Sequence, residues 1–262
     1  MHPVNNANRS VRRGGLSRSF VPVLFALVLV LTSALGAAAS RAEEPLFARM
    51  ETGKGNILLV FYPDLAPHHV GNFVHLSRTG FYNGTKFHRV IPGFVIQGGD
   101  PNSKDADPRN DGMGGPTMID VLTADELALV QKVNDMLEQK GYTGLNGPAN
   151  LKGEFTTDVK HVRGTLSMAR SQAKDSAGSQ FFVCVAATPQ LDGEYTIFGQ
   201  VVTGMEVADV IVNAPKNPAA GRDAPREPVA IDKMTIFEGV AGLTELEKTA
   251  WDEMPADLKS GK

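Results

Sequence analysis

Short apolar runs, many rich in β-branched and aromatic residues, recur along the chain from about residue 46 and are separated by glycine, proline and asparagine. The stretch ARMETGKGNILLVFYPD, residues 48–64, predicts two strands joined at Gly53-Lys54-Gly55. Many short strands with few helices, and no alternation of strand and helix, favour an antiparallel sandwich or barrel, that is, a mainly β fold. Further strands are predicted on either side of Pro92-Gly93 and over residues 164–170, 179–187, 194–202 and 229–240.

Helices are few in this pattern. One is predicted over residues 64–80, because Asp64 can cap it and apolar residues follow at helical spacing. A capping box opens a second, amphipathic helix over residues 123–140. A third helix, with a core-facing side, is expected over residues 205–213, and the charged tail, residues 241–262, holds one amphipathic candidate around LTELEKTAWDEM.

The first 42 residues have the order of features of an export signal. Several arginines come first, the apolar run FVPVLFALVLVLTSALGAAAS follows, and small residues precede EEPLF. This order predicts a signal peptide over residues 1–42, cleaved after Ala39 or Ala42, and an exported protein that is periplasmic or secreted. An uncleaved membrane anchor is the alternative, although the apolar run is near the short end for spanning a bilayer. The Arg12-Arg13 pair matches twin-arginine export only weakly, so the export route stays open.

Composition and charge exclude some classes of partner. The 262 residues are 42% hydrophobic and 21% charged, which is ordinary for a globular protein. Residues 1–42 carry five arginines and no acidic residue, so their removal changes the formal charge from −3 to −8. A protein this acidic is a poor candidate for binding nucleic acid or anionic lipid. The single cysteine, Cys184, cannot form an internal disulfide and is expected in the core.

Patterns for metal binding and for nucleophilic catalysis are weak. The loop DADPRNDG does not fit a calcium site, because counting from Asp107 puts Arg109 at the third ligand position. His68 and His75 could share a helix face, but no cysteine or carboxylate pattern completes a metal site. The serines near residue 170 show no nucleophile-elbow pattern, which gives a hydrolase little support. We therefore expect neither a metal nor a cofactor.

The stretch KFHRVIPGFVIQGGD, residues 86–100, places two polar side chains, Arg89 and Gln97, within an apolar run. Strict alternation of a strand puts Arg89, Val95 and Gln97 on one face. Phe94 could join that face only if Pro92-Gly93 breaks the register. Taken alone, an arginine in such a place is more often part of a structural ion pair at a sheet edge than a functional group.

Three runs resemble the cyclophilin family of peptidyl-prolyl cis/trans isomerases: FHRVIPGFVIQGGD, GTLSMARSQAKDSAGSQFFV and LDGEYTIFGQVVTGMEVAD. They occur in family order, and the resemblance covers about residues 46–238 apart from an insertion over about residues 118–151. It implies a closed eight-stranded antiparallel β-barrel capped by two helices, to which the insertion adds a further helix. The expected isomerase domain is then residues 43–240, followed by the charged tail.

The resemblance also implies an active site in a groove on the outer surface of the barrel. Two positions depart from the family, since Gln190 stands where many relatives have tryptophan and Tyr195 where they have histidine. The catalytic residues implied are Arg89, Gln97 and Phe182, and the substrate-binding residues are Phe94, Val95, Ala169, Arg170, Gln180, Leu191 and Tyr195.

The activity implied is acceleration of X-Pro bond rotation in unfolded or newly exported polypeptides, with Arg89 stabilising the twisted amide and without a cofactor. A proline-peptide-binding module or chaperone with little turnover is the alternative, because Gln190 and Tyr195 alter the pocket. We expect proline-containing polypeptides as partners, no nucleic acid, no membrane anchoring after signal cleavage, and a monomer.

Overall fold

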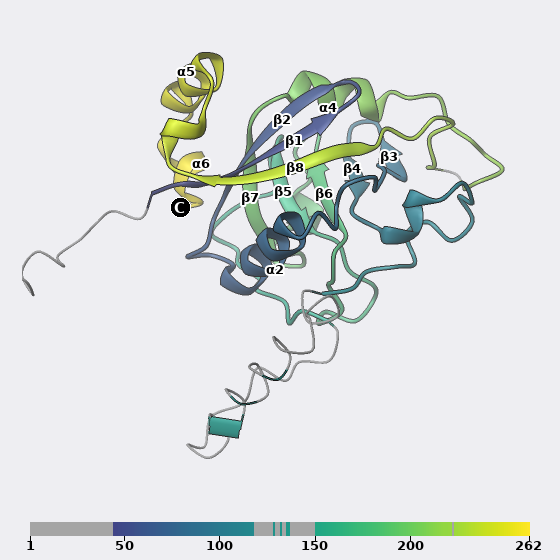
Figure 1. The fold of residues 1–262 in the computed structure, drawn as a ribbon, viewed down its shortest axis with the longest axis horizontal. Helices are drawn as coiled ribbons and strands as arrows, with labels where there is room; N and C mark the ends of the chain where they lie inside the picture. The colour runs from purple at the N-terminus through teal and green to yellow at the C-terminus, as the bar shows by residue number, and fades with distance from the viewer. Residues whose placement is uncertain (1–43, 118–127, 129–131, 133–134, 137–149, 222) are drawn as a thin grey trace, which may run out of the picture. The chain divides into compact units, whose positions relative to one another are not determined.

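The computed structural model describes residues 44–117, 128, 132, 135–136, 150–221 and 223–262. At its centre is one eight-stranded antiparallel sheet with the strand order β3-β4-β6-β5-β7-β2-β1-β8 (Figure 1). The strands are β1 (Leu46–Thr52), β2 (Gly55–Phe61), β3 (Arg89–Ile91), β4 (Val95–Gly98), β5 (Thr165–Met168), β6 (Phe181–Cys184), β7 (Ile197–Thr203) and β8 (Ile231–Glu238).

The central strands are buried on both faces. On β2, Ile57 and Leu59 belong to the main core, whereas Leu58 and Val60 belong to a second apolar cluster. The side chains of β6 alternate in the same way between the main core and a third cluster. Because successive side chains of a strand point to opposite faces, the second and third clusters lie on the outer face of the sheet. This explains why these strands read as continuous apolar runs rather than as alternating ones.

The sheet is open, so the prediction of a closed barrel is wrong. Within the described part of the chain, no ladder joins the two edge strands, β3 and β8. The loop that precedes β8 occupies the free edge of β3 instead: the Val90 amide donates to the Asp223 carbonyl at 2.9 Å, and the Lys216 ammonium donates to the Val90 carbonyl. Since the hydrogen-bonding groups of Val90 are already satisfied, β3 has none there to offer β8.

Two helices, α2 (Pro67–Arg78) and α4 (Met205–Val212), pack their apolar sides into the main core, as the family resemblance implied. The predicted cap of α2 is wrong, because the helix begins after Ala66 and has no capping side chain of its own. Glu154 takes that role from a distant part of the chain, since its carboxylate accepts the backbone N–H groups of His68 and His69 at 3.2 and 3.1 Å. Short 3-10 turns are η1 (Pro101–Lys104), η3 (Pro189–Leu191) and η4 (Val240–Gly242).

The tail forms two further helices, α5 (Glu245–Glu253) and α6 (Ala256–Ser260), and belongs to the same compact unit as the sheet. Thr244 and Glu247 form a capping box at the start of α5. The Glu247 carboxylate also accepts two hydrogen bonds from the Arg49 guanidinium of β1, at 2.8 and 2.7 Å. Trp251 lies edge-on to Phe47 with ring centroids 5.0 Å apart. The tail therefore covers the second apolar cluster on the outer face.

The predicted signal peptide lies outside the described residues, and so does the predicted inserted helix apart from isolated positions. In the part of the chain that the structure does describe, no helix has both the length and the apolar character to cross a membrane.

Candidate active site

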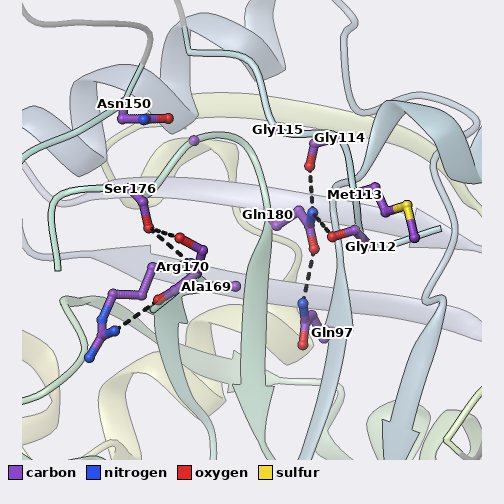
Figure 2. A pocket seen from close by; sticks show the side chains of 12 residues that line it. Gln97, Gly112, Met113, Gly114, Gly115, Asn150, Ala169, Arg170, Ser176 and Gln180 are labelled. Atoms are coloured by element: carbon purple, nitrogen blue, oxygen red, sulfur yellow. Dashed lines mark hydrogen bonds between the residues drawn. The ribbon is translucent and has the colours of Figure 1, made fainter. Parts of the chain in front are cut away.

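The predicted polar residues form a continuous chain of hydrogen bonds across three strands or strand ends. Arg89 of β3 and Gln97 of β4 face each other in the antiparallel ladder, and the Arg89 Nη1 donates to the Gln97 side-chain oxygen at 3.1 Å. The Gln97 amide nitrogen donates to the Gln180 oxygen at 2.9 Å, and the Gln180 nitrogen donates to the carbonyls of Gly112 and Gly114 at 3.0 and 2.5 Å (Figure 2). We call Arg89, Gln97 and Gln180 the polar wall.

The donor-to-acceptor direction along this series of hydrogen bonds is fixed at both ends. A guanidinium can only donate, so the oxygen of Gln97 must face Arg89. A carbonyl can only accept, so the nitrogen of Gln180 must face the glycine loop. Neither amide can flip without losing its partners, and the wall therefore presents one defined pattern of donors and acceptors.

Arg89 is held on its other side by an acidic residue. Its Nε lies 3.6 Å from the Asp223 carboxylate, and 41% of its side-chain surface remains exposed. The ion pair that sequence reasoning treated as the alternative to a functional role is thus present, but it leaves the guanidinium accessible. The sequence gives no indication that Asp223 meets Arg89, because it lies 134 positions after Arg89 in a loop whose path depends on the fold.

The predicted apolar residues form a floor beside this wall. Its buried part is the third cluster, Val95, Phe182 and Cys184, and Val95 pairs with Cys184 across the β4–β6 ladder. Burial raises the pKa of the Cys184 thiol to about 11, which fits the expected role of a small core residue. Four partly buried residues pack against this cluster and complete what we call the apolar floor: Phe94, Ala169, Leu191 and Tyr195.

Phe94 joins this face because Pro92-Gly93 does break the register. The Phe94 amide donates to the Ile91 carbonyl at 3.0 Å, and Gly93 has φ 73°. Proline followed by a residue with positive φ is the pattern of a type II turn, which glycine adopts without strain. The turn places Phe94 and Val95 on the same side, although they are neighbours in sequence.

Tyr195 and Arg170 form one side of the floor. The Tyr195 ring meets Phe182 edge-on with centroids 5.6 Å apart, and the Arg170 guanidinium lies 4.5 Å above the centre of the Tyr195 ring. Arg170 is held there by two hydrogen bonds to the Glu194 carbonyl, at 3.1 and 3.0 Å. Gln190 is exposed in η3 and is not part of the floor.

A pocket of about 330 Å³ adjoins the polar wall (Figure 2). Four of its lining residues were predicted from the sequence, namely Gln97, Ala169, Arg170 and Gln180. The rest were missed: Gly112, Met113, Gly114, Gly115, Asn150, Ser171, Ser176 and Gly178. The glycines follow from close packing, since a Cβ at Gly178 would lie 1.9 Å from the Gly115 carbonyl oxygen and one at Gly114 would lie 2.3 Å from the Asp100 carboxylate. The run DGMGGP, residues 111–116, carries no motif that would mark it as part of a site.

No group of three potential metal ligands occurs among the described residues. The His68 and His69 rings instead bond the Glu154 carboxylate at 2.7 and 2.6 Å. Burial opposes ionisation of Glu154, yet these hydrogen bonds lower its pKa to about 2. The two histidines and Glu154 therefore hold the N-terminus of α2 in place.

Fold and site together define a mainly β protein in which one accessible arginine stands beside a partly exposed apolar floor and a pocket. The family model for cyclophilin type peptidyl-prolyl cis-trans isomerases matches residues 47–236. The chain belongs to this family, and it is an enzyme of the peptidyl-prolyl isomerase class.

Named relatives agree with this assignment. The chain is 36% identical over 222 residues to peptidyl-prolyl cis-trans isomerase A of Dickeya dadantii, covering 82% of this chain and 97% of that protein. It is 36% identical over 197 residues to peptidyl-prolyl cis-trans isomerase-like 2 of Gibberella zeae, covering 75% of this chain but only 28% of that longer protein. The crystal structure of a cyclophilin type isomerase of Cryptosporidium parvum superposes with a TM-score of 0.57 at 29% identity, covering 74% of this chain and 99% of that one.

Proposed function

We propose that the enzyme accelerates X-Pro rotation by donating a hydrogen bond from Arg89 to the proline nitrogen of the twisted amide, while the apolar floor holds the proline ring. The observation that supports this most directly is the placement of Arg89. Its Nη1 is bonded to Gln97 and its Nε faces Asp223, so Nη2 is the donor that we assign to the substrate.

The chemical problem defines what the groove must supply. Rotation about a peptide bond crosses a barrier of about 18–20 kcal/mol, because amide resonance is lost at the twisted geometry. Uncatalysed exchange of an X-Pro bond takes roughly tens to hundreds of seconds. An acceleration of about 10⁵-fold requires about 7 kcal/mol of preferential stabilisation of the twisted state. No proton has to move and no covalent bond has to form.

Arg89 supplies part of that stabilisation. At the twisted geometry the proline nitrogen becomes pyramidal and gains a lone pair that can accept a hydrogen bond. A permanently charged guanidinium is a suitable donor, and one charge-assisted bond contributes about 1.5–3 kcal/mol. Because the planar amide has no such lone pair, the bond favours the transition state over both ground states.

The remaining stabilisation is assigned to the floor and the glutamines. Phe182, Val95 and Leu191 offer apolar contact for the proline ring, so that the acyl part can rotate while the ring stays in place. Removing the amide from water also disfavours its planar, charge-separated resonance form. We assign Gln97 and Gln180 to holding Arg89 and the peptide backbone in register.

We further propose that the enzyme is exported and acts on unfolded or newly translocated polypeptides, as a periplasmic or secreted monomer. The support is the order of features in residues 1–42, where arginines precede an apolar run and small residues. Pulse-chase processing of the full chain, with a variant in which Ala39 and Ala42 are both replaced by bulky residues, would test cleavage. A mature N-terminus at residue 40 or 43 supports the proposal, and an unprocessed chain contradicts cleavage.

A prolyl-peptide isomerisation assay on the wild type, Arg89→Lys and Arg89→Ala tests the mechanism. We expect Arg89→Ala to lower kcat/KM by about 10- to 100-fold, the loss expected for one charge-assisted bond. Arg89→Lys should recover only part of the loss, since an ammonium cannot bond Gln97 and the substrate with the same geometry. Equal rates for wild type and Arg89→Ala would overturn the mechanism, and peptide binding without turnover by the wild type would support the binding-module alternative.

A further inference from the structure

Three polar residues are aligned directly behind the apolar floor. The His161 Nδ1 lies 3.0 Å from an Asp192 carboxylate oxygen, and its Nε2 lies 3.1 Å from the Ser167 hydroxyl. His161 is 1% exposed and Ser167 is not exposed at all. None of the three was singled out in the sequence as a site residue, and none lies within the polar wall or the apolar floor.

The order Asp-His-Ser is that of a nucleophilic triad, but the burial excludes that role. Ser167 lies within β5, and its hydroxyl donates to the Thr196 carbonyl at 2.8 Å. A nucleophile must reach a substrate, and this one has no exposed surface. The arrangement therefore has to act through the residues that it touches.

On one side, the pair holds the loop that carries Leu191 and Tyr195. The Asp192 carboxylate accepts the backbone N–H of His161 at 2.8 Å as well as the ring bond, and the Thr188 amide donates to the His161 carbonyl at 2.8 Å. The Leu191 and Tyr195 amides donate to carbonyls within the same loop, those of Thr188 and Leu191. The loop is thus bonded to His161 at two points, the Thr188 amide and the Asp192 carboxylate.

On the other side, the His161 ring supports Phe182. The two rings stack with centroids 6.1 Å apart and planes 19° apart. Tyr195 meets the same phenyl ring edge-on, at an interplanar angle of 79°. Phe182 is therefore fixed between a histidine and a tyrosine that are linked to each other through Asp192.

The protonation state of His161 is consistent with a fixed orientation. Burial lowers the pKa of His161, although the Asp192 carboxylate opposes this shift, so the ring is neutral at pH 7. Asp192 keeps the proton on Nδ1, which leaves Nε2 as an acceptor. The Ser167 hydroxyl has one proton, so it donates to either Nε2 or the Thr196 carbonyl at any one time. The other groups near the pair are Lys160, whose ammonium lies 3.9 Å from Asp192, and the buried thiol of Cys184.

We infer that His161 and Asp192 are positioning residues of the isomerase site, which fix Phe182 and the Leu191–Tyr195 loop in the geometry that holds the proline ring during rotation. This inference rests on the proposed role of the floor. It assigns no chemical step to either residue, because both lie behind the surface that the substrate touches.

The test compares matched substitutions in the full chain. His161→Phe keeps a flat ring against Phe182 and removes both ring hydrogen bonds. Asp192→Asn keeps the shape and the oxygen that accepts from the His161 backbone and ring, but it removes the negative charge that strengthens both bonds. The control is Glu247→Gln, which makes the same change of carboxylate to amide on the side of the sheet that the tail covers. For each variant, kcat and KM are measured on an unstructured prolyl peptide, together with the melting temperature.

We expect His161→Phe and Asp192→Asn each to lower kcat about 5- to 10-fold while KM changes less than about 3-fold, since a displaced Phe182 still offers apolar contact to the ground state. The double variant should lose little more kcat than the worse single one, because one change removes and the other weakens the same His161–Asp192 interaction. Glu247→Gln should lower the melting temperature and leave kcat unchanged.

A His161→Phe enzyme with a lower melting temperature and a wild-type kcat would overturn the inference, because the role would then be structural alone. If the losses of kcat in the two single variants multiply in the double variant, the two residues do not act as a pair. If His161→Phe does not fold, Asp192→Asn decides the question by the same measurements. The two proposals fail on different results. A wild-type rate for Arg89→Ala overturns the arginine mechanism, whereas the His161 and Asp192 variants are compared only with the wild type on the same peptide.

Discussion

The outer face of the sheet carries two apolar clusters, and only one of them is covered. The cluster over β1, β2 and β7 lies under the C-terminal tail, where Trp251 and Met254 pack against it. The cluster over β4 and β6 is lined by side chains that stay partly exposed, including Phe94 and Leu191. Both arise from the same cause, a run of apolar residues in a strand that is buried on both faces.

The difference shows how one architecture yields a stabilising contact at one cluster and a surface that we propose as the substrate site at the other. Burial of apolar surface contributes about 25 cal/mol per Å², whether the partner is the chain itself or a peptide. Where the tail covers the sheet, that free energy is used in folding. Where the surface stays open, beside an arginine held by Gln97 and Asp223, it is available to a substrate.

Truncation of Trp251 should lower the stability of the fold and leave catalysis unchanged. Trp251→Ala removes a half-buried indole from its edge-on contact with Phe47. We expect a loss of about 2–3 kcal/mol in the free energy of unfolding, less than for a fully buried tryptophan, measured by urea denaturation. A reduced kcat/KM in the fraction that remains folded would contradict the separation between the two clusters.

Truncation of Phe182 should lower catalysis as well as stability, because this residue is only 4% exposed. Phe182→Ala removes the ring at the centre of the apolar floor, and we expect kcat/KM to fall about 10-fold or more, equivalent to about 1.4 kcal/mol or more of transition-state binding. Phe182→Leu, which keeps apolar volume, serves as the control and should lose less. An Ala variant that is destabilised but fully active would show that the floor does not grip the substrate.

The pH dependence of stability should report on the covered side. The hydrogen bonds from Arg49 lower the pKa of Glu247 to about 2, from an ordinary value of 4.5. A lowered folded-state pKa contributes stability that is present above pH 4.5 and is lost as the pH falls toward 2. Glu247→Gln should therefore be less stable than the wild type by about 1–2 kcal/mol at pH 6, and the gap should narrow below pH 4.5.

Urea denaturation of both proteins at several pH values between 7 and 3 measures that gap. A gap that stays constant over the whole range would mean that the carboxylate charge does not stabilise the tail. Isomerase activity at pH 7 should be the same for both proteins.

The smallest change in catalysis is expected from a substitution of Asp223. Asp223→Asn removes the charge that faces the Arg89 Nε at 3.6 Å. Because this ion pair is partly exposed, it contributes no more than about 1 kcal/mol, and we expect kcat to fall about 2- to 3-fold. A rise in kcat would instead indicate that the carboxylate weakens the guanidinium as a donor.

Much of the fold was readable from the sequence because it rests on local pattern. The strands around Gly53–Gly55 and Pro92-Gly93, and the helices α2 and α4, were predicted from apolar runs and turn residues, and the structure has them. Closure of the sheet was predicted wrongly. It depends on whether a loop before β8 occupies the edge of β3, and no local periodicity encodes that contact.

In the candidate site too, some residues could be predicted from local motifs and others depend on long-range contacts. The residues that carry motif signals, such as Arg89, Gln97 and Phe182, are brought together as the resemblance implied. Asp223, His161 and Asp192 were missed. Asp223 and His161 lie outside the three family runs, and Asp192 lies within one of them but meets His161, 31 positions away, only in the folded chain. Their roles follow only from distances and burial in the folded chain.

The sequence by itself determined the strand pattern and the family, and it marked Arg89, Gln97 and Phe182 as candidates, because short-range periodicity and ordered motifs survive without a folded chain. The tertiary structure decided which outer surface the tail covers, which carboxylate caps α2 and which buried histidine stands behind Phe182. The physical reason is that these contacts join segments separated by up to about 200 residues. Their free energy exists only once the sheet has placed both partners side by side.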